Sequence, residues 1–175
     1  IVKTLSPEEQ EQLFGKPECP FCLMVDGKIP TKKVYEDNLV LGILDINPAN
    51  KGHVLLFPKE HASILAQVSE DTLKQMFSIS NKIATACFDA LGAQGTNILV
   101  ANGAAAGQRA PHVLVNIIPR FEGDKVAIGW DPQKVEETDL DKIANDISSK
   151  VPKEKPKKKE PIIIKKDNIS DVRVP

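Results

Sequence analysis

The longest amphipathic segment of the sequence runs from Ser69 to Gly92, and it limits the choice of fold more than any other feature. Ser69, followed by two acidic residues, is typical of the start of a helix, and Gly92 is a residue type that ends helices. Between these ends, apolar residues recur at helical spacing: Leu73, Met76, Phe77, Ile83, Cys87 and Leu91. We therefore predict one long helix that packs on the core through this face.

Shorter apolar segments on both sides of this helix are typical of β-strands. Three precede it, separated by turn-forming residues, and two follow it; they lie at 34–36, 39–44, 54–57, 97–100 and 112–118. We expect the first three to form an antiparallel meander within an α+β domain whose sheet has about five strands. Short helices are predicted near the two ends of the chain, at 6–15 and 140–147.

The composition indicates one globular domain with appended ends. The 175 residues include 23 Lys and Arg against 24 Asp and Glu, so a net charge of -1 gives no overall field that would favour nucleic acid or an anionic membrane. No apolar run approaches the roughly 20 residues that cross a bilayer, and the start does not resemble a signal peptide. We expect a cytoplasmic protein with no membrane contact, a leading helix at 1–15, a folded domain at 16–150, and a lysine-rich linker and tail at 151–175.

Three cysteines and three histidines are the residues best suited to carry chemistry. Cys19 and Cys22 form a C-x-x-C pair, which by itself is consistent with a metal site, a redox pair or two buried thiols. Cys87 lies in the predicted long helix and is expected to be a small buried hydrophobic residue. The histidines fall in two stretches, KGHVLLFPKEH at 51–61 and GQRAPHVLVNIIPR at 107–120.

Together with Leu44-Asp45-Ile46, these stretches resemble the histidine-triad (HIT) family in their order and spacing, from about Cys19 to Arg120. In the zinc-containing subset of that family, two cysteines and two histidines at the corresponding places hold a zinc ion. The resemblance therefore implies a zinc site at Cys19, Cys22, His61 and His112. Four such ligands fill the tetrahedral shell of zinc, so the metal would be structural and would join an N-terminal knuckle to the sheet.

The triad strand departs from the family pattern at the position that performs the reaction. Family members have His-x-His-x-His there, and the middle histidine attacks the α-phosphorus of a nucleotide; this chain has His112, Leu114 and Asn116. Alternate residues of a strand face the same side, so we expect all three at one site. Because leucine has no lone pair to offer phosphorus, covalent nucleotidyl transfer by this route is excluded. Arg109 replaces the hydroxyl residue that usually follows Gly-Gln, and it could bind phosphate or block the site.

The resemblance also implies a nucleotide site between the knuckle and a glycine-rich loop. Apolar residues would contact the base, an acid the ribose, and the loop the phosphate: Phe21, Met24, Asp45, Ile46, Asn102, Gly107 and Gln108, with His53 at the phosphate end. Each of these also has an ordinary structural explanation. Asp45 could cap a turn, Phe21 and Met24 could be core residues, and Gly107 could be needed for a turn.

These features predict a catalytically inactive HIT-domain protein: a homodimer with structural zinc that acts as a binding or assembly subunit and could retain a purine nucleotide. The tail at 161–175 could dock on a protein partner by adding a strand, or could be a solubilising tail. The lysine-rich spacer before it could contact nucleic acid or the ribosome. The alternatives are an active nucleotide phosphoramidase, hydrolase or nucleotidyl transferase with a non-standard mechanism, in which His53 or Asn116 positions water, and a redox role for the cysteine pair.

Overall fold

The computed structural model describes residues 19–152, which divide between two compact units. The first extends to Ile128 and contains a five-stranded sheet, and the second begins at Gly129 and contains helix α4 (Glu137–Lys150). No helix in this described range is long and apolar enough to span a membrane. The predicted leading helix at 1–15 and the tail at 161–175 lie outside the described residues, and the predicted domain boundary at 150 stays a prediction.

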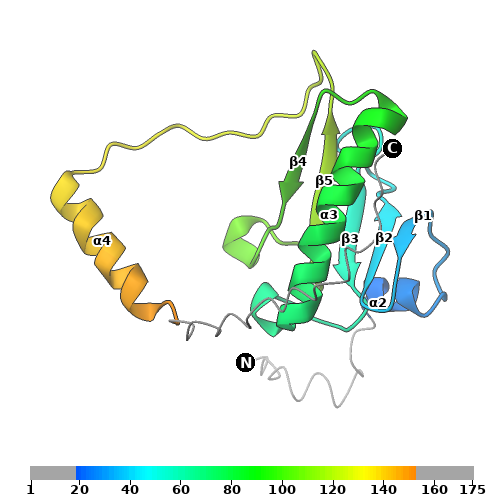
Figure 1. Ribbon diagram of the computed structural model, residues 1–175, viewed down its shortest axis with the longest axis horizontal. Helices are drawn as coiled ribbons and strands as arrows, with labels where there is room; N and C mark the ends of the chain where they lie inside the picture. The colour runs from blue at the N-terminus through cyan, green and yellow to red at the C-terminus, as the bar shows by residue number, and fades with distance from the viewer. Residues whose placement is uncertain (1–18, 153–175) are drawn as a thin grey trace, which may run out of the picture. The chain divides into compact units, whose positions relative to one another are not determined.

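All strand pairs of the sheet are antiparallel, and the order is β1-β2-β3-β5-β4 (Figure 1). The strands are β1 (Lys33–Glu36), β2 (Val40–Leu44), β3 (Val54–Pro58), β4 (Gly95–Leu99) and β5 (Val115–Arg120). The predicted meander is confirmed in β1 to β3. The predicted last strand begins later than expected, at Val115 instead of His112, because Val113 donates its N–H to the carbonyl of Ala62 and not to a neighbouring strand.

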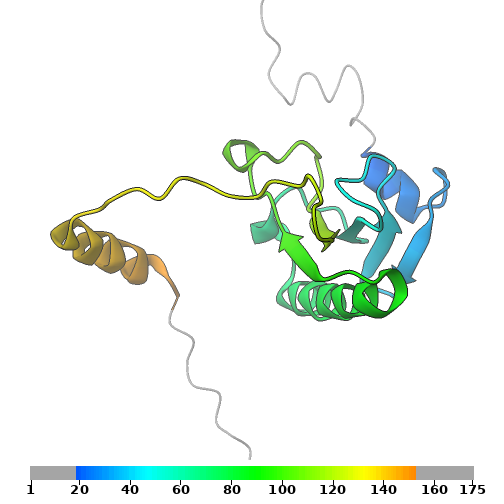
Figure 2. The same ribbon diagram turned by 90° about the horizontal axis from the view of Figure 1, so that it is seen from above.

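The sheet has an apolar layer on each face because side chains alternate along its strands. The larger cluster includes Val54, Leu56 and Val115, and it packs against the long helix α3 (Glu70–Leu91). The smaller cluster, Leu41, Ile43 and Phe57, lies on the other face, where the short helix α2 (Pro20–Val25) covers it. Figure 2 shows the two helices on opposite sides of the sheet. The α+β architecture predicted from the sequence is confirmed.

The predicted ends of the long helix are confirmed, but its buried face is rotated. The hydroxyl of Ser69 accepts a hydrogen bond from the Thr72 amide at 3.2 Å, and Gly92 takes a left-handed φ of 68°. Phe77, predicted to face the core, is 49% exposed. Successive residues turn by about 100°, so the burial of Met76 places its neighbour on the flank of the helix. The buried residues are Thr72, Met76, Ile79, Ser80, Ile83, Ala84 and Cys87.

Two connections complete the unit that carries the candidate site. A 3-10 turn, η1 (Leu65–Gln67), follows β3, and a second, η2 (Ala104–Ala106), lies between β4 and β5. Gly103 and Gly107 flank η2 with φ values of 93° and 84°, a region that favours glycine over other residues. The predicted glycine-rich connection is therefore a tight, ordered loop beside β5.

Candidate functional site

Two cysteines and two histidines converge where α2, the loop after β3 and the segment before β5 meet. The ligand atoms of Cys19, Cys22, His61 and His112 all lie within 4.8 Å of one another. Tetrahedral zinc, with bonds of about 2.3 Å to sulfur and about 2.0 Å to nitrogen, would hold S and N atoms roughly 3.5 Å apart. The distances from Sγ to Nδ1 are 3.5 Å for Cys19 and His112, 3.3 Å for Cys22 and His61, and 3.8 Å for Cys22 and His112. The four residues therefore fit a zinc ion.

Groups around the cluster orient His112 for metal binding. Its Nε2 donates to the carbonyl of Pro58 at 2.9 Å, which leaves the lone pair of Nδ1 directed at the cysteines. Burial lowers the pKa of His112, so its imidazole is held in the neutral form that binds metals. Burial, followed by the neighbouring Cys19, raises the pKa of the Cys22 thiol to about 11. A cation at this position would supply the positive charge that a thiolate requires.

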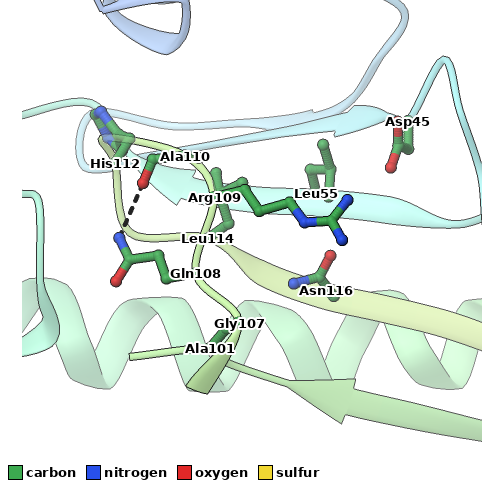
Figure 3. Close-up of a pocket in the computed structure, with 10 residues that line it drawn as sticks. All are labelled: Asp45, Leu55, Ala101, Gly107, Gln108, Arg109, Ala110, His112, Leu114 and Asn116. Carbon is green, nitrogen blue, oxygen red and sulfur yellow. Dashed lines mark hydrogen bonds between the residues drawn. The ribbon is translucent and has the colours of Figure 1, made fainter. Parts of the chain in front are cut away.

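A cavity of about 370 Å³ lies beside the cluster, on the face of the sheet away from α3. His112, Leu114 and Asn116 all line it, so the predicted common side of the triad segment is observed although only Asn116 belongs to a regular strand. Opposite them, the η2 loop contributes Gly107, Gln108 and Arg109. Figure 3 shows the three triad positions along one wall and the side chain of Arg109 extended across the cavity.

The loop's own polar groups are largely occupied within the protein. The Gln108 side chain accepts from the Gly103 amide at 2.7 Å and donates to the carbonyls of Ser63 and Ala110 at 2.6 and 2.9 Å. Asn102 accepts from the Leu65 amide at 3.0 Å and is not among the residues that line the cavity. These two predicted phosphate contacts therefore shape the loop through their side chains.

His53 lies behind the cavity wall. Its Nδ1 accepts from the Ala49 amide at 3.1 Å, which places the ring proton on Nε2, and Nε2 then donates to Oδ1 of Asn116 at 3.1 Å. Oδ2 of Asp45 is also 3.5 Å from Nδ1, but a backbone amide can only donate, so we assign the tautomer from Ala49. His53 is 6% exposed and reaches the cavity through Asn116.

A second, more apolar groove of about 740 Å³ adjoins the cavity, because Asp45 and Leu55 line both. The predicted base contacts Phe21, Met24 and Ile46 line this groove, and Ile46 is 90% exposed. Asp45 uses Oδ1 to accept from the Asn47 amide at 2.9 Å, as a turn-capping acid does, and still faces both hollows. The implied base and ribose residues are therefore brought together.

Sequence reasoning missed two groups of the site. Leu55 separates the groove from the cavity and pairs with Asn116 across the sheet; the alternation of β3 could have placed it there. The carbonyl of Pro58, which fixes the orientation of His112, has no signal in the sequence because any residue could supply it.

Comparison with known proteins identifies the same family that the motifs resemble. The family model "HIT domain" matches residues 26–123. An uncharacterized HIT-like protein of Methanocaldococcus jannaschii is 42% identical over 74% of this chain and 98% of its own length. An adenosine 5'-monophosphoramidase of Schizosaccharomyces pombe is 34% identical over 76% of this chain and 98% of its own.

A solved structure agrees with these sequence matches. The crystal structure of a Zn-bound histidine triad family protein from Mycobacterium smegmatis is similar with a TM-score of 0.61 and 36% identity, covering 75% of this chain and 96% of that one. The family model covers more than half of this chain, and the sheet, helix and cysteine-histidine cluster are those expected of the family. The chain therefore belongs to the HIT family.

Proposed function

We propose that this HIT domain binds a purine nucleotide in the cavity and groove without cleaving it by the family's covalent route. The observation that carries this proposal is Leu114, whose side chain lines the cavity between His112 and Asn116. A leucine there can contact a nucleotide but cannot attack it. The protein would then serve as a nucleotide-binding or assembly subunit instead of a transferase.

The shape and chemistry of the two hollows support nucleotide as the ligand. Aromatic and aliphatic side chains of α2 and β2 line the groove, as a base requires, and Asp45 lies at the junction where a ribose would present its hydroxyls. The cavity, which is more polar than the groove, begins on the other side of Asp45 and Leu55. The relative from S. pombe is named for its action on an adenosine 5'-monophosphate derivative, which supports adenosine 5'-monophosphate (AMP) as the first ligand to test.

We also assign a structural zinc ion to Cys19, Cys22, His61 and His112. Bound there, zinc would supply four strong bonds that hold α2, the loop after β3 and the segment before β5 together. All four ligands come from the protein, so the metal would have no open position for a reacting water. The fit of the distances to a tetrahedron and the orientation of His112 support this assignment.

The main competing function is hydrolysis by direct attack of water. The His53–Asn116 hydrogen bond favours it, because Asn116 lines the cavity and could position a water molecule. However, the His53 proton already lies on Nε2 and its Nδ1 accepts from the Ala49 amide. His53 therefore has no free lone pair toward the cavity with which to act as a base.

Binding of AMP and cleavage of adenosine 5'-phosphoramidate, measured side by side, distinguish nucleotide binding from hydrolysis. We expect the zinc-loaded protein to bind AMP with a dissociation constant on the order of micromolar and to leave adenosine 5'-phosphoramidate intact. The double variant Leu114→His/Asn116→His should gain phosphoramidate cleavage. Leu114→Met/Asn116→His is the matched control, because it keeps an apolar group of similar size at the attack position and should stay inactive.

Each contrary result has a distinct meaning. Cleavage by the natural protein that disappears in His53→Ala would favour hydrolysis over the binding function. Failure of the natural protein to bind AMP or adenosine would overturn nucleotide binding altogether. The protein would then be a zinc-containing scaffold, and a partner bound through 161–175 would be the next function to test.

Oligomerisation belongs to the same proposal. We propose a homodimer formed through the outer face of α3 and the free edge of β4. The outer face of α3 is not wholly polar, since Phe77 and Phe88 are 49% and 44% exposed. Strand β4 pairs only with β5 in the described sheet, so its other edge is open to a second copy.

A further inference from the structure

Resting on the proposed nucleotide binding, we infer that Arg109 is the group that binds the nucleotide's phosphate, and that it makes the site selective for 5'-phosphorylated nucleosides over nucleosides. The inference comes from the hydrogen-bond donors of the cavity. A phosphate needs several donors, and a buried one also needs positive charge. Most donors around this cavity are already used by the protein itself.

The backbone amides of residues 106–108 offer little to an anion. The amides of Ala106, Gly107 and Gln108 donate to carbonyls inside the loop, at 3.1, 3.0 and 3.2 Å. The side-chain amide of Gln108 donates to two further carbonyls. A loop of this kind can form a surface against a phosphate, but its hydrogen bonds would have to break before it could bind one.

The wall of the cavity is equally short of donors. The Nε2 proton of His112 goes to Pro58, and that of His53 goes to Asn116. The side chains of Leu55 and Leu114 have no donor to give. Asn116 keeps some capacity, since its side-chain amide makes one long bond of 3.4 Å to the carbonyl of Leu99.

Arg109 differs from all of these groups. It is exposed, it lines the cavity, and its guanidinium has no hydrogen-bond or ion-pair partner in the described part of the chain. Figure 3 shows its side chain lying across the cavity, with the guanidinium beside Asn116. A guanidinium presents five N–H donors in a planar fork that matches two phosphate oxygens.

Charge fixes the direction in which the nucleotide would lie. Among residues 19–152, Asp45 is the only carboxylate lining the cavity, and it lies where the cavity joins the groove. A phosphate there would be repelled, whereas a ribose hydroxyl would be a good donor to Asp45. The base is therefore placed in the groove beyond Asp45, and the phosphate in the cavity on the guanidinium of Arg109 and away from the Asp45 carboxylate.

The test compares AMP with adenosine, because the difference between them isolates the phosphate. We expect the natural protein to bind AMP about 10 to 100 times more tightly than adenosine, as charge-assisted hydrogen bonds of this kind provide. Arg109→Gln should bring the two affinities within about twofold of each other while leaving the adenosine affinity unchanged. Arg109→Lys should keep part of the preference, since it retains the charge without the fork. Because Arg109 is exposed and has no partner among the described residues, Arg109→Gln should have the same melting temperature as the natural protein.

Lys125 supplies the matched control, because it is an exposed lysine of the same unit that lines neither the cavity nor the groove. Lys125→Gln should leave the AMP preference intact. The inference is overturned if Arg109→Gln binds AMP as tightly as the natural protein or more tightly, which would make Arg109 a blocking group, or if Lys125→Gln loses the preference instead. Equal binding of AMP and adenosine by the natural protein overturns the inference and leaves nucleotide binding in place; binding of neither overturns both.

Discussion

At the scale of single residues, Asp37 makes the clearest prediction about pH. Burial alone would raise the pKa of its carboxyl, but hydrogen bonds from Gln75, the Val40 and Leu39 amides, and Tyr35 outweigh burial and lower it to about 2. A carboxyl whose pKa is depressed in the folded state stabilises the fold above its unfolded pKa of about 3.9, and this stability is lost as the pH falls toward 2.

Asp37→Asn should therefore lower the free energy of unfolding at pH 7 by about 1 to 3 kcal/mol, since a charged acceptor is lost from the β1–β2 turn. The difference from the natural protein should shrink when urea unfolding is repeated at pH 4, 3 and 2. Asp131→Asn removes an exposed carboxylate of the second unit and should change neither the free energy of unfolding at pH 7 nor its dependence on pH. A constant difference across this pH range would contradict the assignment.

How well a site residue could be predicted from the sequence depends on whether its role rests on its own side chain or on backbone groups around it. The zinc ligands, Asp45 and the triad positions could be placed from motif spacing, because their side chains carry the chemistry. The hydrogen bonds that Gln108 and Asn102 make to the backbone could not be predicted in this way. Their partners are the Ser63 carbonyl and the Leu65 and Gly103 amides, groups that any residue supplies. The same holds for the role of Arg109, since only the hydrogen-bond partners of its neighbours distinguish it.

At the scale of elements, the cap of α3 can be tested by itself. Ser69→Ala removes the hydroxyl that accepts from the Thr72 amide, and we expect a loss of about 1 kcal/mol in the free energy of unfolding. Ser78 is exposed in the middle of the same helix, so Ser78→Ala is the matched control and should be neutral or slightly stabilising. Thermal denaturation followed by circular dichroism measures both. Equal effects of the two substitutions would mean that the cap contributes nothing.

The elements show why strand and helix patterns predict a fold well but boundaries less well. Alternation predicted the common side of His112, Leu114 and Asn116, and caps identified both ends of α3. The rotation of α3 was wrong because Ile79 and Phe77 are both large and apolar, and local sequence cannot say which one meets the sheet. The start of β5 was wrong because Ala62, a residue 51 positions earlier, takes the Val113 hydrogen bond.

At the scale of the whole first unit, the proposed zinc ion would join α2, the loop after β3 and the segment before β5. Removing zinc with a chelator should cost roughly 3 kcal/mol, which lowers the Tm of a domain of this size by about 10 °C. Hydrogen exchange should then increase in α2 and around His61 before it increases in α3. Cys22→Ser should lose zinc by metal analysis, whereas Cys87→Ala should keep it, because Cys87 is a buried core residue of α3. Full zinc content in Cys22→Ser would contradict the assigned ligands.

Exposed apolar side chains on α3 and β4 are the basis for the proposed homodimer. Phe77 and Phe88 lie eleven residues apart on α3, about three helical turns, so they share one exposed flank of the helix. Ile98 and Leu99 are 39% and 37% exposed on the edge strand β4, where a second copy could cover them. We expect light scattering to give a mass of about twice the 19.1 kDa of one chain.

Phe77→Lys/Phe88→Lys should reduce that mass to a single chain at micromolar concentration, because two charges would be buried in the interface without partners. Val34→Lys is the control: Val34 is 46% exposed, on β1 at the opposite edge of the sheet, so a dimer through α3 and β4 should tolerate it. Dissociation by Val34→Lys alone would move the interface to the apolar groove between β1 and α3, whose lining includes Tyr35, Ile83 and Leu91. A single-chain mass for the natural protein would show instead that the outer face of α3 stays exposed to water.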